Sequence, residues 1–325
     1  MAITLKELQA PIAQDLAAFE QLFAMSMKSR VPLLNTIMNY IVKRKGKQIR
    51  PLFVMYSAQL CGGINERTYR AAALVELLHT ATLVHDDVVD ESYARRGFFS
   101  INALWKNKIA VLVGDYLLSR GLLLSMEHDD FDLLKITSRA VRDMSEGELM
   151  QLERSRFLDI TEEIYFEIIR QKTASLIASC CAIGAASAGA DATQVEQFRL
   201  FGERIGLAFQ IRDDLFDFGD NDSGKPTGID IREKKLTLPL IHALKQVAPA
   251  EARSMLRLIK GNKSDREKLK QVTAFVAAHG GMEYAREMMN TLKAEAFAAI
   301  APVLAGGEHR VEMPKLVDFV IDRRH

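Results

Sequence analysis

The chain has 325 residues, 48% of them hydrophobic, which is enough to bury one large core or two modest ones. Its 43 Lys and Arg residues balance 42 Asp and Glu residues, and a net charge of +1 excludes a long-range attraction to nucleic acid or anionic membranes. The three cysteines, Cys61, Cys180 and Cys181, do not make a disulfide framework and are typical of a reducing compartment. We expect a soluble cytoplasmic protein without a nucleic-acid partner.

The N-terminal residues, MAITLKELQAPIAQDLAAFEQLF, lack the charged-then-apolar pattern of a signal peptide, and their acidic residues argue against a transit peptide. A run of about 18 uncharged apolar residues, which a membrane-spanning helix needs, is absent from the sequence. We therefore expect no transmembrane segment.

Apolar residues recur every three or four positions nearly throughout, as in residues 71–90 and 198–218, and this period predicts helices. Breaks are expected where turn-forming residues gather, in CGGINE from Cys61, EHDDFD from Glu127, ASAGADA from Ala186 and GDNDSGKPTGID from Gly219. The pattern predicts one all-α domain over residues 1–325, with short loops between helices. A separate subdomain after about Pro249 is a weaker alternative.

The segment HDDVVD places Asp86, Asp87 and Asp90 at positions i, i+1 and i+4 of an apolar helix. Asp86 and Asp90 should share one face, with Asp87 turned about 100° away. Carboxylates stacked in this way repel one another unless a cation lies between them. His85 is a poor partner for a hard cation, and we interpret it as a packed helix residue.

A second copy with the same spacing occurs in FQIRDDLFDF, as Asp213, Asp214 and Asp217. Oxygen ligands of this kind suit Mg²⁺, which binds one or two carboxylates and fills its other positions with water and phosphate. One such pattern alone is common on solvated helix faces, but two copies on apolar helices favour a Mg²⁺–diphosphate site. We expect Asp86, Asp90 and Asp213 to bind the metal.

Asp129, Asp130 and Asp132 in EHDDFD have a different spacing and lie in an expected break. We interpret them as a solvated loop.

Cations that could bind diphosphate flank both clusters. They are Arg95 and Arg96 after the first cluster, Lys225 and Lys235 after the second, Lys172 beside Thr173 in RQKTASL, and Lys43, Arg44, Lys45, Lys47 and Arg50 in KRKGKQIRP. None of these cations indicates a binding site by itself. Together they predict a cavity with acidic metal sites and enough positive charge for two diphosphates.

The motifs GKQIRP, LLHTATLVHDDVVDESYARRG, KTASL, FQIRDDLFDF and GKPTGIDIREKKLTLP, in this order, resemble those of the trans-polyprenyl diphosphate synthases. They span about residues 43 to 240, and the helical pattern on both sides also fits. The resemblance implies the all-α isoprenoid-synthase fold around a deep central cavity, Mg²⁺ dependence and a homodimer. The substrates it implies are an allylic diphosphate and isopentenyl diphosphate.

The resemblance also implies roles for individual residues. The six aspartates of the two clusters would bind the Mg²⁺-bridged allylic diphosphate. The same substrate would be contacted by Arg95, Lys172, Thr173, Gln210, Lys225 and Lys235. Isopentenyl diphosphate would be held by Lys47, Arg50, His79 and Arg96. The chain departs from the family pattern at Lys45 and Lys234, where a glycine is common, and at Gln48, where an arginine is common.

The implied reaction is head-to-tail prenyl transfer, in which the allylic C–O bond ionises and isopentenyl diphosphate attacks the cation. The released diphosphate would take the final proton. A class I terpene cyclase and a non-catalytic regulatory subunit are alternatives, but such proteins usually lack one complete aspartate cluster. A short-chain synthase is a further alternative.

Product length is expected to depend on the residues one turn before the first cluster. Ala81 and Thr82 lie about 6–7.5 Å along the helix axis from Asp86, on roughly the same face. Short-chain members of the family place an aromatic residue there, and the next layer, Leu77 and Leu78, is apolar and yielding. The other interpretation is that small residues merely let two helices pack closely. We expect a long product. The sequence does not decide whether this product is used for a quinone or for a carrier lipid.

Overall fold

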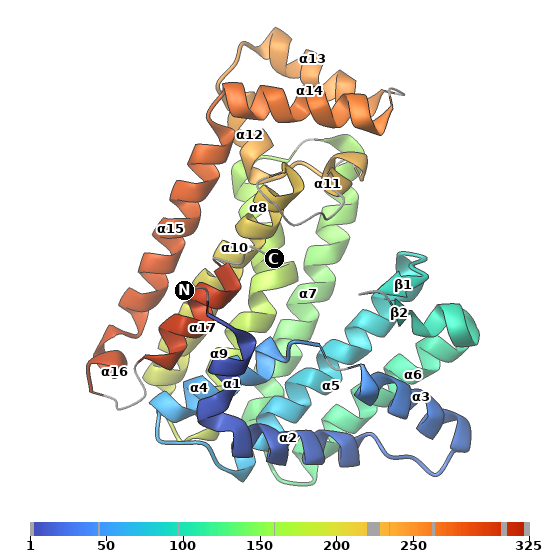
Figure 1. Ribbon diagram of the computed structural model, residues 1–325, viewed down its shortest axis with the longest axis vertical. Coiled ribbons are helices and arrows are strands. Elements are labelled where there is room, and N and C mark those ends of the chain that lie inside the picture. The colour runs from blue at the N-terminus through green and yellow to red at the C-terminus, as the bar shows by residue number, and fades with distance from the viewer. Residues whose placement is uncertain are drawn as a thin grey trace. The chain divides into compact units, whose positions relative to one another are not determined.

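The computed structural model of the protein describes residues 3–44, 46–95, 98–158, 160–219, 228–233, 235–261, 264–306 and 311–321. These residues are mainly α-helical (Figure 1). Two short strands, β1 (Ala94–Arg95) and β2 (Phe98–Phe99), pair antiparallel, with Ala94 opposite Phe99. The prediction of an all-α fold is confirmed.

The first helices in chain order are α1 (Leu5–Gln9), a 3₁₀ turn η1 (Ala10–Ile12), α2 (Ala13–Ser26), α3 (Pro32–Lys43), α4 (Ile49–Leu60), α5 (Glu66–Val89), α6 (Ile101–Met126) and α7 (Phe131–Phe157). The central ones are α8 (Glu162–Ile169), a π-helical turn η2 (Arg170–Ala174), α9 (Ser175–Ser187), α10 (Ala192–Asp217) and α11 (Ile229–Arg232). The last are α12 (Leu238–Lys245), α13 (Pro249–Lys260), α14 (Asp265–Ala278), α15 (Gly281–Ala299), α16 (Ala301–Gly306) and α17 (Glu312–Ile321).

Three of the expected breaks separate helices, as predicted, whereas most of the fourth, residues 220–227, lies outside the described residues. Side chains at the helix starts explain two of them. Asn65 accepts a hydrogen bond from the backbone N–H of Thr68 and caps α5. Asp191 accepts one from the backbone N–H of Gln194 at 2.8 Å and caps the start of α10.

The chain forms two compact units. Unit 1 comprises Met1–Val141, Ser179–Phe198 and Pro302–Leu316, and unit 2 comprises Arg142–Ala178, Arg199–Ala301 and Val317–His325. The expectation that residues 1–325 act as one domain stays a prediction.

Unit 1 has its core on α4 and α5. Leu52, Phe53 and Val54 of α4 are 0% exposed. α5 lies along α6 and also packs against α2 and α4 (Figure 1). Gly184 of α9 allows a close approach to α4, since a Cβ there would lie 2.2 Å from the carbonyl oxygen of Val54. The packed side chains hold α5, and with it the first aspartate cluster, in place.

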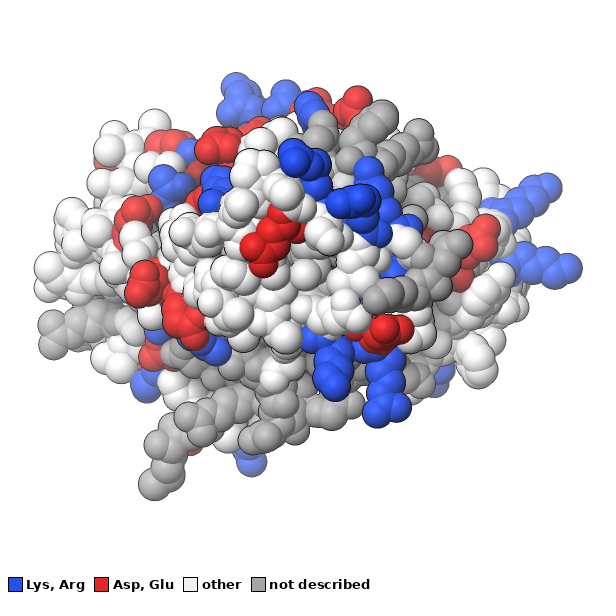
Figure 2. Space-filling model, turned by 90° about the horizontal axis from the view of Figure 1, so that it is seen from above, with Lys and Arg blue, Asp and Glu red and all other residues white. Residues whose placement is uncertain are grey.

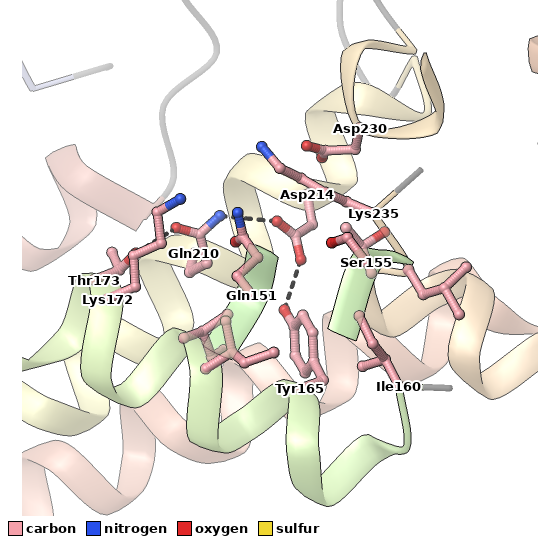
Figure 3. Close-up of a pocket in the computed structure, with 14 residues that line it drawn as sticks. Gln151, Ser155, Ile160, Tyr165, Lys172, Thr173, Gln210, Asp214, Asp230 and Lys235 are labelled. Atoms are coloured by element: carbon pink, nitrogen blue, oxygen red, sulfur yellow. Dashed lines mark hydrogen bonds between the residues drawn. The ribbon is translucent and has the colours of Figure 1, made fainter. Parts of the chain in front are cut away.

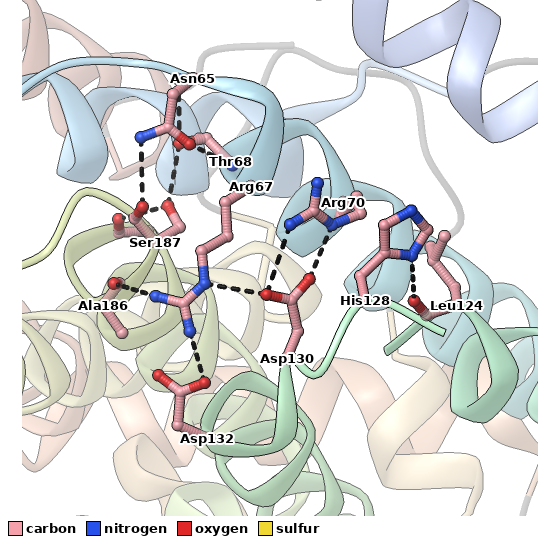
Figure 4. Close-up of polar contacts among 11 residues, drawn as sticks. Asn65, Arg67, Thr68, Arg70, Leu124, His128, Asp130, Asp132, Ala186 and Ser187 are labelled. Atoms are coloured by element: carbon pink, nitrogen blue, oxygen red, sulfur yellow. Dashed lines mark hydrogen bonds and ion pairs between the residues drawn. The ribbon is translucent and has the colours of Figure 1, made fainter. Parts of the chain in front are cut away.

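A buried ion-pair cluster fixes the other end of α5 (Figure 4). Arg70 Nε donates to Asp130 at 2.7 Å, and Arg67 Nε donates to the same carboxylate at 2.9 Å. Arg67 also donates to the carbonyl oxygen of Ala186 at 2.9 Å and pairs with Asp132. The interpretation of EHDDFD as a solvated loop is therefore wrong for Asp130, which is 3% exposed because two arginines compensate its charge.

Unit 2 has its core on α10. Phe201, Ile205, Ala208, Ile211 and Leu215 recur at helical spacing and are all 0% exposed. In the same unit α12 packs against α15 and α8, and α14 packs against α11 and α15. This core holds the second aspartate cluster at the end of α10.

One helix in the described part of the chain, α6, is long and apolar enough to cross a membrane, and 39% of its most apolar window is buried. Such a helix is weak evidence for a span, because core and interface helices share its composition. Figure 2 shows one face of the molecule, on which Lys and Arg side chains are interspersed with Asp and Glu side chains and uncharged surface. This mixed surface agrees with the near-zero net charge.

Replacing Arg70 with methionine should lower the free energy of unfolding by about 3 kcal/mol, because the change leaves a buried carboxylate short of one partner. Urea denaturation followed by circular dichroism measures this. The control is Arg142→Met, which removes an ion pair whose arginine side chain is 65% exposed and should cost no more than about 0.5 kcal/mol. Equal losses in the two variants would contradict a structural role for the buried pair.

The effect of Arg70→Met should also depend on pH. Burial raises the pKa of Asp130, but hydrogen bonds from Arg70 and Arg67 outweigh burial and hold the pKa below the ordinary 3.8. Stability from a lowered carboxyl pKa is present above the unfolded value and is lost as the pH falls through the folded value. The difference between wild type and variant should therefore shrink below about pH 4.

Candidate active site

The first aspartate cluster lies in the last turn of α5, in unit 1. Asp86 and Asp90 are exposed and Asp87 is 5% exposed, so Asp87 points away from the other two, as the helical spacing predicts. The backbone carbonyl of Asp87 accepts hydrogen bonds from Asn102 Nδ2 and from the N–H of Ser92, each at 2.9 Å. These bonds fix the end of the helix and the direction of its carboxylates.

The second cluster lies in the last turns of α10, in unit 2, and again has an exposed first aspartate and a buried second one. Asp213 is exposed and Asp214 is 3% exposed. Asp217 is half-buried, and its carboxylate accepts the backbone N–H of Ile229 at 2.8 Å and of Asp230 at 3.0 Å. Asp217 thereby caps the short helix α11.

Both clusters stand at the C-terminal ends of their helices, where carbonyl oxygens and the helix dipole are already negative. Carboxylates at this end are unfavourable without a positive partner. The arrangement therefore suits a cation.

A cavity of about 100 Å³ in unit 2 brings several predicted residues together (Figure 3). Its walls include Lys172, Thr173, Gln210, Asp214 and Lys235, which come from three segments of the chain. The structure thus brings these predicted residues together, and their action on one substrate stays a prediction.

A chain of hydrogen bonds crosses this cavity (Figure 3). Thr173 Oγ1 donates to Gln210 Oε1 at 2.8 Å, and Gln210 Nε2 donates to Asp214 Oδ1 at 2.9 Å. Tyr165, which is 4% exposed, donates to the other oxygen of Asp214 at 2.6 Å. Both carboxylate oxygens of Asp214 are thus occupied.

Lys172 and Thr173 lie on the π-helical turn η2 between α8 and α9. Such wide turns are rare and occur frequently at functional sites. α10 approaches this turn closely, since a Cβ on Gly206 would lie 2.5 Å from Cα of Ala174. On the other side, a Cβ on Gly147 of α7 would lie 2.7 Å from the backbone nitrogen of Lys172. Two glycines therefore let the turn pack between neighbouring helices.

The two lysines of the cavity pair with carboxylates, Lys172 with Glu148 and Lys235 with Glu233. Burial lowers the pKa of Lys235, but its bond to Glu233 outweighs burial and raises the pKa above the ordinary value, so the lysine stays charged. Both lysine side chains are about one-third exposed. Diphosphate oxygens could replace these carboxylates as partners.

Two acidic groups of the cavity, Asp214 and Asp230, have raised pKa values, chiefly because they are buried. Burial, followed by the charge of Asp230, raises the pKa of Asp214 to about 8. Burial and the charge of Asp217 raise the pKa of Asp230 to about 6. Within the described ranges, no three acidic, histidine or cysteine side chains converge on one point.

The residues expected to hold isopentenyl diphosphate lie in unit 1 where the structure describes them. Lys47 is exposed, Arg50 is half-buried and His79 is 8% exposed. Arg50 lies on α4, which packs against α5, the helix that carries His79. Their convergence on a substrate stays a prediction.

Several predicted residues lie outside the described residues, namely Lys45, Arg96, Lys225 and Lys234. For Arg95 the backbone is described, in β1, but not the side chain.

The expected chain-length residues lie on α5. Ala81 is 0% and Leu78 is 5% exposed, whereas Thr82 is half-buried and donates to the carbonyl oxygen of His79. Leu78 packs near Gly121 of α6, where an added Cβ would lie 3.4 Å from it. α5 and α6 thus pack together one turn below Ala81, and the role of Ala81 and Thr82 in product length stays a prediction.

Sequence reasoning missed Tyr165, Asp230 and Glu148. Tyr165 precedes Lys172 by seven residues, which is two helical turns on one face, and this spacing was the available signal. Asp230 lines the cavity and Glu148 pairs with Lys172 through tertiary contacts, and their sequence positions carry no comparable signal.

A model of the family described as polyprenyl synthetase matches residues 31–276. The chain belongs to this family. It is 38% identical to the all-trans-nonaprenyl-diphosphate synthase (geranyl-diphosphate specific) of Rhodobacter capsulatus, over 99% of both chains. It is 35% identical to the octaprenyl diphosphate synthase of Escherichia coli, over 92% of this chain and 93% of the relative.

Solved structures agree with this assignment. A decaprenyl diphosphate synthase from Rhodobacter capsulatus superposes with a TM-score of 0.89 at 35% identity, over 99% of this chain and 100% of that one. A Caulobacter crescentus polyprenyl synthase complexed with calcium and isoprenyl diphosphate gives 0.88 at 34% identity, over 100% and 99%. The predicted family and isoprenoid-synthase fold are confirmed.

Replacing Gly206 with alanine should raise the KM for the allylic diphosphate several-fold, because the new methyl displaces the turn that carries Lys172. It should also cost about 1–3 kcal/mol of stability through overpacking. The control is Gly306→Ala, where an added Cβ meets nothing within 4 Å. Steady-state kinetics and urea denaturation measure the two effects, and a Gly206→Ala enzyme with unchanged KM would contradict this role.

Proposed function

We propose that the protein is a trans-prenyltransferase that condenses an allylic diphosphate with successive isopentenyl diphosphates to give a long all-trans polyprenyl diphosphate. The observation that carries this proposal is the pair of complete aspartate clusters at the ends of α5 and α10, together with the lysine-containing cavity beside the second one. The octaprenyl and nonaprenyl synthases among its relatives support a long product.

Both clusters would bind Mg²⁺ with the allylic diphosphate, with Asp86, Asp90 and Asp213 as ligands because they are the exposed carboxylates. When bound, Mg²⁺ supplies positive charge that stabilises the leaving diphosphate. The ligand chemistry of these oxygens suits this ion.

The chain's own residues would orient the substrates and neutralise charge. Lys172, Gln210 and Lys235 donate hydrogen bonds to the allylic diphosphate, which favours ionisation of the C–O bond. Lys47, Arg50 and His79 hold isopentenyl diphosphate, so that its double bond attacks the allylic cation before water does. The released diphosphate accepts the proton lost from the new chain.

The short-chain alternative has support among the relatives. The chain is 32% identical to a short chain isoprenyl diphosphate synthase of Methanothermobacter thermautotrophicus, over 88% of this chain and 89% of the relative. Product analysis decides between the two.

Two further proposals follow from the sequence. A cytoplasmic location is supported by the three cysteines, which are all free in the structure. We also propose that residues 1–325 act as one catalytic domain, since the family model spans both units. A quinone is one candidate acceptor of the product.

Chelation should abolish elongation, and Mg²⁺ should restore it. Asp86→Ala and Asp213→Ala should each lower turnover by about 10²-fold or more, because each loses a ligand for the charge that stabilises the leaving group. Incubation with farnesyl and isopentenyl diphosphates, followed by reversed-phase chromatography, measures the product. Asp129→Ala, at a carboxylate outside both clusters, is the control. Near-normal turnover in either cluster variant would exclude the two-cluster mechanism.

The wild-type product should have about six to ten isoprene units, with eight near the centre, because the small side chain of Ala81 would let the growing chain pass beyond the first cluster. Ala81→Tyr should shorten it to about three or four units by placing a ring one turn from the metal site. The control Ala81→Ser adds little bulk and should leave the length unchanged. A long product from a folded Ala81→Tyr enzyme would show that this position does not set the length.

A homodimer is proposed through an apolar face of α6. Leu104, Val111, Leu112, Leu122 and Leu123 are 41–56% exposed on this helix. An exposed apolar surface of this kind marks an interaction site, and a helix face is suited to pairing with its own copy.

Leu112→Glu should dissociate the dimer, because it places a charge in the apolar contact. Sedimentation velocity measures the change. Val311→Glu, at a residue that is 51% exposed and outside α6, is the control and should stay dimeric. If the Leu112→Glu variant stays dimeric, the interface does not lie on this face of α6.

A further inference from the structure

Tyr165 is a buried hydroxyl in the cavity that has no role in the proposed chemistry so far. Its oxygen lies 2.6 Å from Asp214 Oδ2, and both side chains are less than 5% exposed. The Tyr165 hydroxyl donates its hydrogen to this oxygen, so Asp214 is the acceptor in the bond.

The acceptor role of Asp214 decides how the Gln210 amide is oriented. Gln210 Nε2 donates one hydrogen to Asp214 Oδ1 at 2.9 Å, and Gln210 Oε1 is occupied by the Thr173 hydroxyl at 2.8 Å. An amide nitrogen carries two hydrogens. The second hydrogen of Gln210 is therefore available to an anion in the cavity, and its carbonyl oxygen is turned away from that anion.

We propose that Tyr165 is a positioning residue for the allylic diphosphate, acting through Asp214 on the orientation of the Gln210 amide. The inference rests on the proposed function, in which Gln210 contacts this substrate. Tyr165 comes from α8 and Gln210 from α10, so the bond also ties the two helices that line the cavity.

The physical reason is that the carboxylate of Asp214 needs two donors to keep one orientation. Without the tyrosine hydroxyl, Oδ2 is left unpaired in a buried site, and the carboxylate turns to find another donor. The Gln210 amide then loses the acceptor oxygen of Asp214. That acceptor favours the orientation in which the amide nitrogen, rather than the amide oxygen, faces Asp214. In the reversed orientation, Gln210 presents a carbonyl oxygen to the diphosphate and repels it.

The matched control is Tyr284, whose hydroxyl donates to Glu162 on the same helix α8. Tyr284→Phe and Tyr165→Phe each remove one tyrosine–carboxylate hydrogen bond from α8. Only Tyr165 lines the cavity with Gln210 and Asp214. A general weakening of α8 would affect both variants alike.

Isothermal titration calorimetry with inorganic diphosphate and Mg²⁺ provides a readout that does not require turnover. Tyr165→Phe should weaken diphosphate binding about 5- to 20-fold, and Tyr284→Phe should change it less than about two-fold, in line with the loss of one hydrogen bond to a charged network. In steady-state kinetics, the KM for the allylic diphosphate should rise by a similar factor while the KM for isopentenyl diphosphate stays unchanged.

A double-mutant cycle tests whether the effect passes through Gln210. In a Gln210→Ala background, Tyr165→Phe should have little further effect on diphosphate affinity. Three results would overturn the inference: unchanged affinity in Tyr165→Phe, an equal rise in both KM values, or a full effect in the Gln210→Ala background. If wild type fails to elongate but binds diphosphate with this dependence on Tyr165, the proposed function is wrong and the positioning role stands.

Discussion

The repulsion between carboxylates at the negative ends of helices is the constraint on which this protein depends. Asp90 caps the end of α5 and Asp217 ends α10, where unpaired carbonyl oxygens already carry partial negative charge. A chain that only had to fold would place cations there. The raised pKa values of Asp214 and Asp230 show that burial adds to this repulsion. A bound cation would offset this energy cost, which is the physical argument for the proposed metal site.

The three aspartates of the second cluster have different structural roles. Asp213 faces solvent, Asp214 accepts from Tyr165 and Gln210, and Asp217 caps α11. Identical side chains at fixed spacing thus act as an exposed carboxylate, the centre of a hydrogen-bond network and a helix cap. Helical geometry explains the difference, because adjacent positions point about 100° apart and meet different surroundings.

Close backbone packing keeps the cavity narrow. Gly206 and Gly147 let α10 and α7 approach the π-helical turn that carries Lys172. A closely packed interior transmits small displacements. The two glycines therefore contribute to the placement of the charged Lys172 side chain, although they carry no polar side chain themselves. The buried Arg70–Asp130 pair in unit 1 is a polar counterpart, since it fixes the start of α5 far along the helix from its aspartates.

The sequence by itself determined the helices, their breaks, the two aspartate clusters and the family, because all of these depend on spacing along one chain. Its reading of Asp130 as solvated failed, since Arg67 and Arg70 lie about 60 residues earlier, and no local pattern pairs them with it. Only the tertiary structure decided that Tyr165 donates to Asp214, that Glu148 pairs with Lys172, and that the second aspartate of each cluster is buried. The physical reason is that hydrogen-bond partners and burial depend on which distant helices pack together, and periodicity specifies only the face that each helix buries.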